Sequence, residues 1–339
     1  HLMRFGYSRS LSDDLVLYFI TLGWKAIPPV KRDRSLSEKF LREYLEVIGQ
    51  FAEWNAQSIF WWATHFSSKN RFDNSIMPLL QEWSECINAI ETCPDESSLV
   101  LIDVSWEIIV GLKSLAPNYG WKISIFSSPL SHFRYRLCGK FKFWKVFLGE
   151  IIISLQSIWI TRRTFGRPGF PSISNRSDYL IKSFTYSKNF KDKDKYTDPF
   201  FGLFSSFIGH SSEPVKTVAT AIGFKEKKKC YALMKELTFP VHPLESYLHY
   251  SDVILSACQW LYLFVFNSFK VKGEIRFFGY EVTAFFCEFV RCGGLRISFF
   301  QFLHFEVGKR LGKLYNFKTC LMTYEGRPWE RFFIAGLRS

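Results

Sequence analysis

Short apolar runs alternate with amphipathic segments along most of the chain, and this alternation restricts the fold more than any other feature. In the first half, apolar runs that we expect to be buried strands lie at 14–22, 58–66, 97–104 and 121–128. Segments with helical periodicity lie between them, at 36–57, 75–91 and 106–116. Strands that alternate with helices favour a parallel sheet with helices on both of its faces.

The second half repeats this pattern after an aperiodic stretch rich in Gly, Pro and Ser. A long helical segment is predicted for 132–163, and we place a linker at 166–177. Strands are then predicted at 178–186, 215–224 and 318–325, with helices at 226–237 and 329–339. A further helical region runs from about 244 to 314 and is broken by glycines at 273, 279, 293 and 294.

These patterns predict an α/β protein with two Rossmann-like parallel-sheet domains. The first domain would be 1–165, and the second would be 178–339 with the long helical insertion at about 244–314. The chain stops just after a strand–turn–helix unit, where a parallel sheet usually continues. We therefore expect the second domain to be truncated and the polypeptide to be the N-terminal part of a longer protein.

Composition narrows the classes of partner and the cellular compartment. The net charge of +13 favours polyanions, anionic lipid or phosphorylated ligands. No zinc-finger, RRM or bZIP pattern is present, so we expect no specific nucleic-acid binding. The eight cysteines form no Cys-x-x-Cys pair, which argues against a zinc site and for reduced thiols in a cytoplasmic protein.

Two long apolar segments raise the question of membrane contact. Val253–Phe269 has no charged residue but contains Ser256, Gln259 and Asn267, and Phe147–Ile160 is interrupted by Glu150. Both fall short of a typical membrane span. We predict two buried helices here, with contact at a membrane interface as the less favoured alternative.

The stretch TYEGRPWERFF, 323–333, holds the strongest candidate site. Glu325 follows a predicted strand, and ligands of open parallel sheets bind at the carboxyl ends of the strands. Arg327 and Arg331 could hold an anion with help from the helix N-terminus. Glu325 or Glu330 could remove a proton from a sugar hydroxyl, and Trp329 could stack on a sugar or base. In the structural alternative, Glu330 only complements the helix dipole and Trp329 belongs to the core.

Two further segments carry candidate binding residues. The run 61–72 ends its predicted strand in Ser68, Lys69 and Asn70, a combination that suits phosphate or polyol binding, although an ordinary turn fits equally well. Asp198 follows a charged loop and precedes an aromatic pair, so it could belong to an ordered substrate loop. No Gly-x-Gly-x-x-Gly, Walker A, Gly-x-Ser-x-Gly or His-Glu-x-x-His motif is present, which weakens the dinucleotide, P-loop, serine-hydrolase and zinc-protease readings.

Three segments, WWATHFSSKNRF, SFTYSKNFKDKDKYTDPFFG and TYEGRPWERFFIAGLRS, together resemble a family of bacterial surface-carbohydrate (O-antigen) biosynthesis proteins related to GT-B glycosyltransferases. The resemblance extends over most of the chain. The matching positions are Trp62, Ser68, Lys69, Asn70, Tyr324, Glu325, Gly326, Pro328, Trp329 and Glu330. No catalytic role assigned in the family carries over to any of them.

The resemblance implies a cytoplasmic enzyme of lipopolysaccharide or capsule assembly that works at the inner face of the membrane. It would transfer a sugar from a nucleotide-sugar donor to a glycan or lipid-linked acceptor. Separately from the resemblance, we expect no permanently bound cofactor and assign no metal-ligating residues. Anionic inner membrane would be a peripheral partner. The rival hypothesis is a non-catalytic scaffold or membrane-docking component of a polysaccharide assembly complex.

Overall fold

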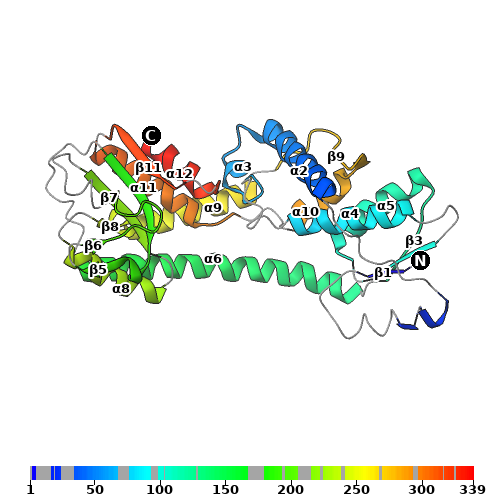
Figure 1. Ribbon diagram of the computed structural model, residues 1–339, viewed down its shortest axis with the longest axis horizontal. Coiled ribbons are helices and arrows are strands. Elements are labelled where there is room, and N and C mark those ends of the chain that lie inside the picture. The colour runs from blue at the N-terminus through cyan, green and yellow to red at the C-terminus, as the bar shows by residue number, and fades with distance from the viewer. Residues whose placement is uncertain are drawn as a thin grey trace. The chain divides into compact units, whose positions relative to one another are not determined.

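The computed structural model describes most of the chain, with gaps. The described residues are 2–4, 17–18, 20–23, 34–67, 76–92, 98–102, 104–126, 129–166, 179–192, 195–204, 215–221, 224–237, 241–266, 269–292, 297–315, 317–323 and 326–339. They form a mixed α/β structure in which helices predominate (Figure 1). The chain divides into unit 1, residues 1–143 and 268–297, and unit 2, residues 144–267 and 298–339.

Unit 1 contains a three-stranded parallel sheet in the order β1-β2-β3. Its strands are β1 (Leu2–Arg4), β2 (Ser98–Ile102) and β3 (Lys122–Phe126). Its helices are α2 (Arg34–Asn55), α3 (Ile59–Ala63), α4 (Ile76–Thr92), α5 (Trp106–Tyr119) and α10 (Thr283–Arg291). Gly111 in α5 lets Trp83 and Phe285 approach closely, because a Cβ at residue 111 would lie 2.5 Å from the Trp83 ring.

Two predicted strands of unit 1 are helical instead. The run 58–66 contains α3, which begins after Ser58, whose hydroxyl accepts the backbone N–H of Trp61. The serine cap and the burial of Trp61 stabilise the helical conformation of this short run. Within 14–22, the described residues 17–18 and 20–21 are helical, and Leu17, Tyr18, Ile20 and Leu22 are exposed, so the prediction of a buried strand was wrong there.

A β-hairpin lies inside the predicted helical region. Strands β9 (Arg276–Phe277) and β10 (Tyr280–Glu281) pair antiparallel across the two-residue turn Phe278-Gly279, in which both residues have positive φ (55° and 83°). A turn of this kind matches the twist of the strands that it joins. The Phe278 N–H donates to the Glu43 carboxylate on α2 at 2.9 Å, which holds the strained residue in place.

Unit 2 is built on a four-stranded parallel sheet in the order β11-β4-β7-β8. The strands are β4 (Tyr179–Thr185), β7 (Val215–Ala221), β8 (Val241–Pro243) and β11 (Thr319–Met322). The helices are α8 (Phe224–Glu236), α9 (Tyr250–Phe266), α11 (Phe300–Leu314) and α12 (Pro328–Leu337), with the single turns η1 (Ser187–Asn189) and η2 (Leu244–Tyr247). A small antiparallel hairpin, β5 (Phe190–Asp192) and β6 (Lys195–Tyr196), follows η1.

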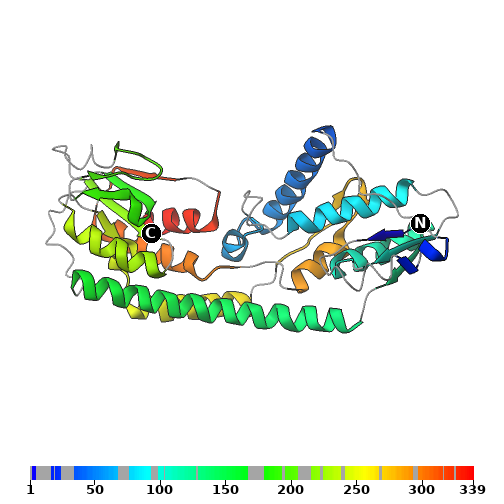
Figure 2. The ribbon, with the colours of Figure 1, turned by 60° about the horizontal axis from the view of Figure 1, so that its bottom comes forward.

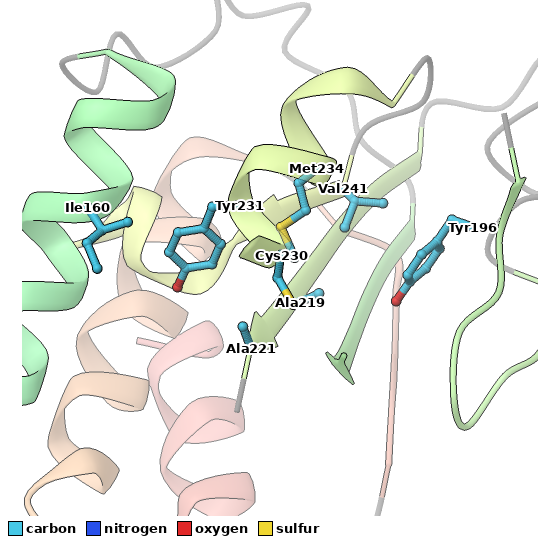
Figure 3. Packing of buried hydrophobic residues seen from close by; sticks show 8 residues of the cluster. All are labelled: Ile160, Tyr196, Ala219, Ala221, Cys230, Tyr231, Met234 and Val241. Atoms are coloured by element: carbon cyan, nitrogen blue, oxygen red, sulfur yellow. The ribbon is translucent and has the colours of Figure 1, made fainter. Parts of the chain in front are cut away.

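One core cluster of unit 2 lies between α8 and the sheet. Figure 3 shows Cys230, Tyr231 and Met234 of α8 above Ala219 and Ala221 of β7, with Ile160 of α6 (Pro129–Phe165) beside Tyr231. The long helix α6 therefore packs its second half into unit 2. The linker expected at 166–177 lies outside the described residues from 167 onward, and the contacts divide the chain within α6 rather than after it.

Glycines fix the packing of α11 against α12. A Cβ on Gly308 would overlap the carbonyl oxygen of Phe333, and a Cβ on Gly336 would overlap the carbonyl oxygen of Phe305. The two helix backbones therefore touch directly. This close approach sets α12, and with it the turn that follows β11, firmly against α11.

Candidate functional site

The carboxyl edge of the unit 2 sheet is where the predicted residues Arg327, Trp329, Glu330 and Arg331 lie. All four strands are parallel, so their carboxyl ends meet at this edge, where α/β proteins bind ligands. β11 leads here into α12, β4 into η1, β7 into α8 and β8 into η2. The Ser187 N–H donates to Glu226 of α8 at 3.1 Å, which ties two of these connections together.

Glu330 caps the helix that follows β11. Gly326 has φ of 73°, Arg327 is extended as the N-cap, and Pro328 occupies the first helical position. The Glu330 carboxylate accepts the Arg327 N–H at 3.2 Å, as a glutamate three residues after the cap is expected to do. Glu330 is only 1% exposed. This geometry is that of the structural alternative, and the catalytic role of Glu330 remains a prediction.

Arg327 and Arg331 both lie on the first turn of α12 and are half-buried. The Arg331 guanidinium donates to the Gly326 carbonyl at 3.4 Å, so it folds back over the turn. A helix N-terminus with two guanidinium groups is a favourable place for an anionic group. The structure thus brings both predicted arginines to the sheet edge, next to the position of Glu325 in the chain.

Trp329 has a cationic partner inside the protein. The Nζ of Lys182, in β4, lies 3.6 Å from the Trp329 ring centroid and 5.0 and 5.4 Å from those of Phe184 and Phe333. Lys182 is fully buried, so this ammonium is surrounded by aromatic faces that attract it electrostatically. Trp329 is itself buried, which agrees with the core alternative, and its stacking on a sugar remains a prediction.

His304 of α11 completes this group, which we call the Lys182 cluster: Lys182, Phe184, His304, Trp329 and Phe333. The His304 ring lies 5.2 Å from the Trp329 ring. Burial, followed by the positive charge of Lys182, lowers the pKa of His304 to about 3. The imidazole is therefore neutral, and its Nδ1–H donates to the Phe300 carbonyl at 2.7 Å. Its Nε2 is an acceptor with no hydrogen-bond partner among the described residues.

Asp198 anchors a turn. Its Oδ1 accepts hydrogen bonds from the Ser183 hydroxyl at 2.9 Å and from the backbone N–H groups of Phe200 and Phe201 at 2.8 and 2.9 Å. The Tyr196 hydroxyl donates to Oδ2 at 3.2 Å, and burial together with Asp198 raises the pKa of that tyrosine. Asp198 is buried, so the structure uses it to hold the 198–202 turn against β4. Its role in substrate binding stays a prediction.

The remaining predicted residues, Ser68, Lys69, Asn70 and Glu325, lie outside the described residues. The segment before Ser68 is α3 and a single bridge at Thr64, so the strand expected to end at Ser68 to Asn70 is not there. The strand before Glu325 and the helix after it are present as β11 and α12, and the role of Glu325 stays a prediction.

A buried ion pair near the same sheet was not predicted. Lys227 Nζ lies 2.5 Å from Glu245 Oε1 and 3.0 Å from the Ser157 hydroxyl, and the Tyr231 hydroxyl donates to Glu245 Oε2 at 2.5 Å. Burial alone would raise the pKa of Glu245, but the Lys227 ammonium and the Tyr231 hydroxyl hold it below its usual value. Lys227 belongs to the run KEKKK, so one lysine of that run points inward.

No group of three or more His, Cys, Asp or Glu side chains suited to a metal ion occurs among the described residues. Comparison of the chain with protein-family models, with curated proteins and with solved structures found no match. The mixed α/β class and the parallel four-stranded sheet are therefore the firm description of this protein.

Proposed function

We propose that this protein is a glycosyltransferase-like enzyme of bacterial surface-polysaccharide (O-antigen or capsule) biosynthesis. It transfers a sugar from a nucleotide-sugar donor to a glycan or lipid-linked acceptor. Its two α/β units correspond in this proposal to two Rossmann-like domains of GT-B type. The proposal rests on the resemblance of the three sequence segments to that family.

The observation that best supports the proposal is the β11–α12 turn. The acidic residue Glu325 follows a parallel strand, and two arginines begin the next helix. Sugar transfer from a nucleotide donor needs a base for the acceptor hydroxyl and positive groups for the departing phosphate. Glu325 supplies the base in this proposal, and Arg327 and Arg331 hold the phosphate. Glu330 is assigned to the cap rather than to the chemistry, because its carboxylate is occupied by the Arg327 N–H.

The Lys182 cluster packs against the first turn of α12. Its cation lies against Trp329, so positive potential is concentrated directly beneath the first turn of α12. A buried charge acts over a longer distance than an exposed one because water screens it less. We infer that Lys182 strengthens the attraction of this sheet edge for an anionic donor without contacting it.

The test is a Glu325→Gln substitution in the full-length protein. Transfer, measured as release of nucleoside diphosphate from a panel of nucleotide sugars, should fall by about 10²–10⁴-fold, the usual contribution of a general base. The melting temperature should stay unchanged. Glu236→Gln, at an exposed position on α8, is the matched control and should leave both quantities unaltered. Loss of stability with Glu325→Gln would assign that residue a structural role instead.

A second candidate function is the non-catalytic one, a scaffold or membrane-docking component of a polysaccharide assembly complex. The exposed apolar side chains of α6 and α9 favour it. The two candidates differ in ligand response. An enzyme should show a thermal shift with at least one nucleotide sugar, whereas a docking component should bind lipid vesicles and show none.

A further inference from the structure

Two helices of unit 2 lie side by side and antiparallel. Phe147 of α6 stacks on Trp260 of α9 with ring centroids 4.0 Å apart, and at the other end the Arg162 guanidinium lies 4.3 Å from the Tyr250 ring centroid. Figure 2 shows α9 running along the second half of α6. One side of each helix therefore packs against neighbouring elements, and the opposite side faces outward.

The outward side of α6 is apolar over about four turns. Trp144, Leu148, Ile152 and Trp159 are exposed, and their spacing of four, four and seven residues places them on one helix face. At 1.5 Å per residue this face is about 22 Å long. Ile152 is 53% exposed, although a side chain of this size is usually buried in a soluble protein.

The outward side of α9 is apolar as well. Its exposed apolar side chains are Ile254, Leu255, Tyr262, Val265 and Phe266, and Phe264, which stacks on Trp260, is partly exposed beside them. The prediction of two buried helices was therefore wrong for these faces. Trp144 of α6 also contacts Trp260 of α9, with ring centroids 6.5 Å apart, so the exposed faces approach each other at that end. We call these exposed side chains of the two helices the α6/α9 apolar face.

The fully exposed charges on these two helices are positive. Within 144–165 and α9, which the structure describes completely, the exposed charged residues are Lys145 and Arg163, and no Asp or Glu is exposed. The Arg163 guanidinium lies 5.4 Å from the Trp159 ring centroid. Tryptophan with adjacent basic residues at both ends of an apolar face is typical of a helix at the boundary between lipid headgroups and acyl chains. The net charge of +13 has the same sign.

The inner side of α6 shows why the helix would lie in the membrane surface and not cross it. Among the described residues, Trp144–Phe165 is the one helical stretch long and apolar enough to span a bilayer. However, Glu150 accepts hydrogen bonds from the Ser298 hydroxyl and the Phe299 N–H, and Ser157 bonds to Lys227. Spanning would carry these polar groups and their packed neighbours into hydrocarbon, where no water is present to replace the lost hydrogen bonds.

We propose that the α6/α9 apolar face docks unit 2 on an anionic lipid bilayer, with both helices parallel to the membrane surface. The apolar side chains enter the interface, and Lys145 and Arg163 contact anionic headgroups. This docking rests on exposed side chains and charges, and it holds whether or not the protein transfers a sugar.

Flotation of the full-length protein with phosphatidylcholine vesicles, with and without about a third phosphatidylglycerol, tests the proposal. The wild type should float with the anionic vesicles and less with the neutral ones. Ile152→Glu combined with Val265→Glu should lower vesicle partitioning at least tenfold. The matched control is Leu203→Glu, a 66% exposed apolar position of unit 2 outside these helices, and it should bind like the wild type.

A charge-reversal variant separates the two contributions. Lys145→Glu with Arg163→Glu should weaken binding to anionic vesicles several-fold and leave binding to neutral vesicles unchanged, and added salt should weaken wild-type binding. Ile152→Ser with Val265→Ser is the milder second variant, and circular dichroism checks that every variant is folded.

Failure of the wild type to float, or unchanged flotation of the folded double variants, would overturn the proposal. So would a concentration-dependent dimer, seen by light scattering, that the double variants abolish while the wild type ignores vesicles. In that case a second copy of the chain covers the face.

Discussion

Replacing Gly336 by alanine probes the contact that holds α12, and thus the β11–α12 turn, in place. The new Cβ would overlap the carbonyl oxygen of Phe305 and lie 2.9 Å from the backbone nitrogen of Lys309. Both atoms belong to the backbone of α11, so no side chain can rotate away. The helices must move apart, and overpacking of this kind costs about 1–3 kcal/mol.

The same substitution at Gly149 is the matched control. Gly149 lies within α6, and no atom lies within 4 Å of a Cβ built there. Alanine should therefore stabilise the helix by up to about 1 kcal/mol, because glycine is the poorer helix former. At Gly336 this gain offsets part of the overlap. Because the added Cβ would meet two backbone atoms of α11, we expect the upper part of the range for overpacking and a net loss of about 2 kcal/mol.

Calorimetry resolves the two outcomes. In a domain of 150–250 residues, about 1 kcal/mol shifts the melting temperature by roughly 2–4 °C, so Gly336→Ala should lower the melting temperature of unit 2 and Gly149→Ala should raise it slightly. If Gly336→Ala left the melting temperature unchanged or raised it, the direct contact of the two helix backbones would be disproved.

Three further predictions concern buried polar groups. The pKa of His304 is lowered to about 3, whereas an unfolded imidazole titrates near 6.5, so the unfolded chain takes up the proton first as the pH falls. Stability should therefore fall by about 1.4 kcal/mol per pH unit between pH 6.5 and 3, and urea unfolding should show that His304→Asn lacks this component. Glu330→Ala should lower the free energy of unfolding by about 1 kcal/mol, because the helix loses its cap, and Glu330→Gln should lower it much less. Urea unfolding measures both, and equal losses would contradict the capping role. Lys227→Met should lower the stability of the fold by about 3–5 kcal/mol, because it leaves the Glu245 carboxylate buried without its cation. Thermal unfolding should show that adding Glu245→Gln restores much of the lost stability.

Much of the architecture was predictable because periodicity and turn residues agreed. The strands within 178–186, 215–224 and 318–325 and the helices within 226–237 and 329–339 were confirmed as β4, β7, β11, α8 and α12. The two strand predictions at 14–22 and 58–66 were wrong because short apolar runs fit either period. Ser58 then decided the second case, since its cap starts a helix.

Only the part of the candidate site that is formed by consecutive residues could be predicted from the sequence. The glycine, proline and glutamate of the β11–α12 turn have the geometry that their order in the chain indicates. Lys182 and His304 come from distant segments, and only folding brings them to Trp329. One signal was available: Lys182 is the one charged residue of β4, and a charge inside a buried strand requires a stabilising environment. The exposure of α6 and α9 corresponds to the less favoured alternative, because hydropathy does not reveal what covers an apolar helix.

Each unit is built from two separate segments of the chain, so neither unit can complete its fold until its second segment has been synthesised. Unit 1 needs residues 268–297, since Trp106 of α5 donates to Glu288 of α10 at 2.9 Å and Trp83 packs on Phe285. Residues 268–297 are synthesised only after residues 144–267. Until then, the apolar side chains of residues 1–143 that pack on them remain exposed. Unit 2 likewise cannot close until 298–339 emerge. A nascent chain arrested near residue 143 should therefore be sensitive to protease and should recruit chaperones.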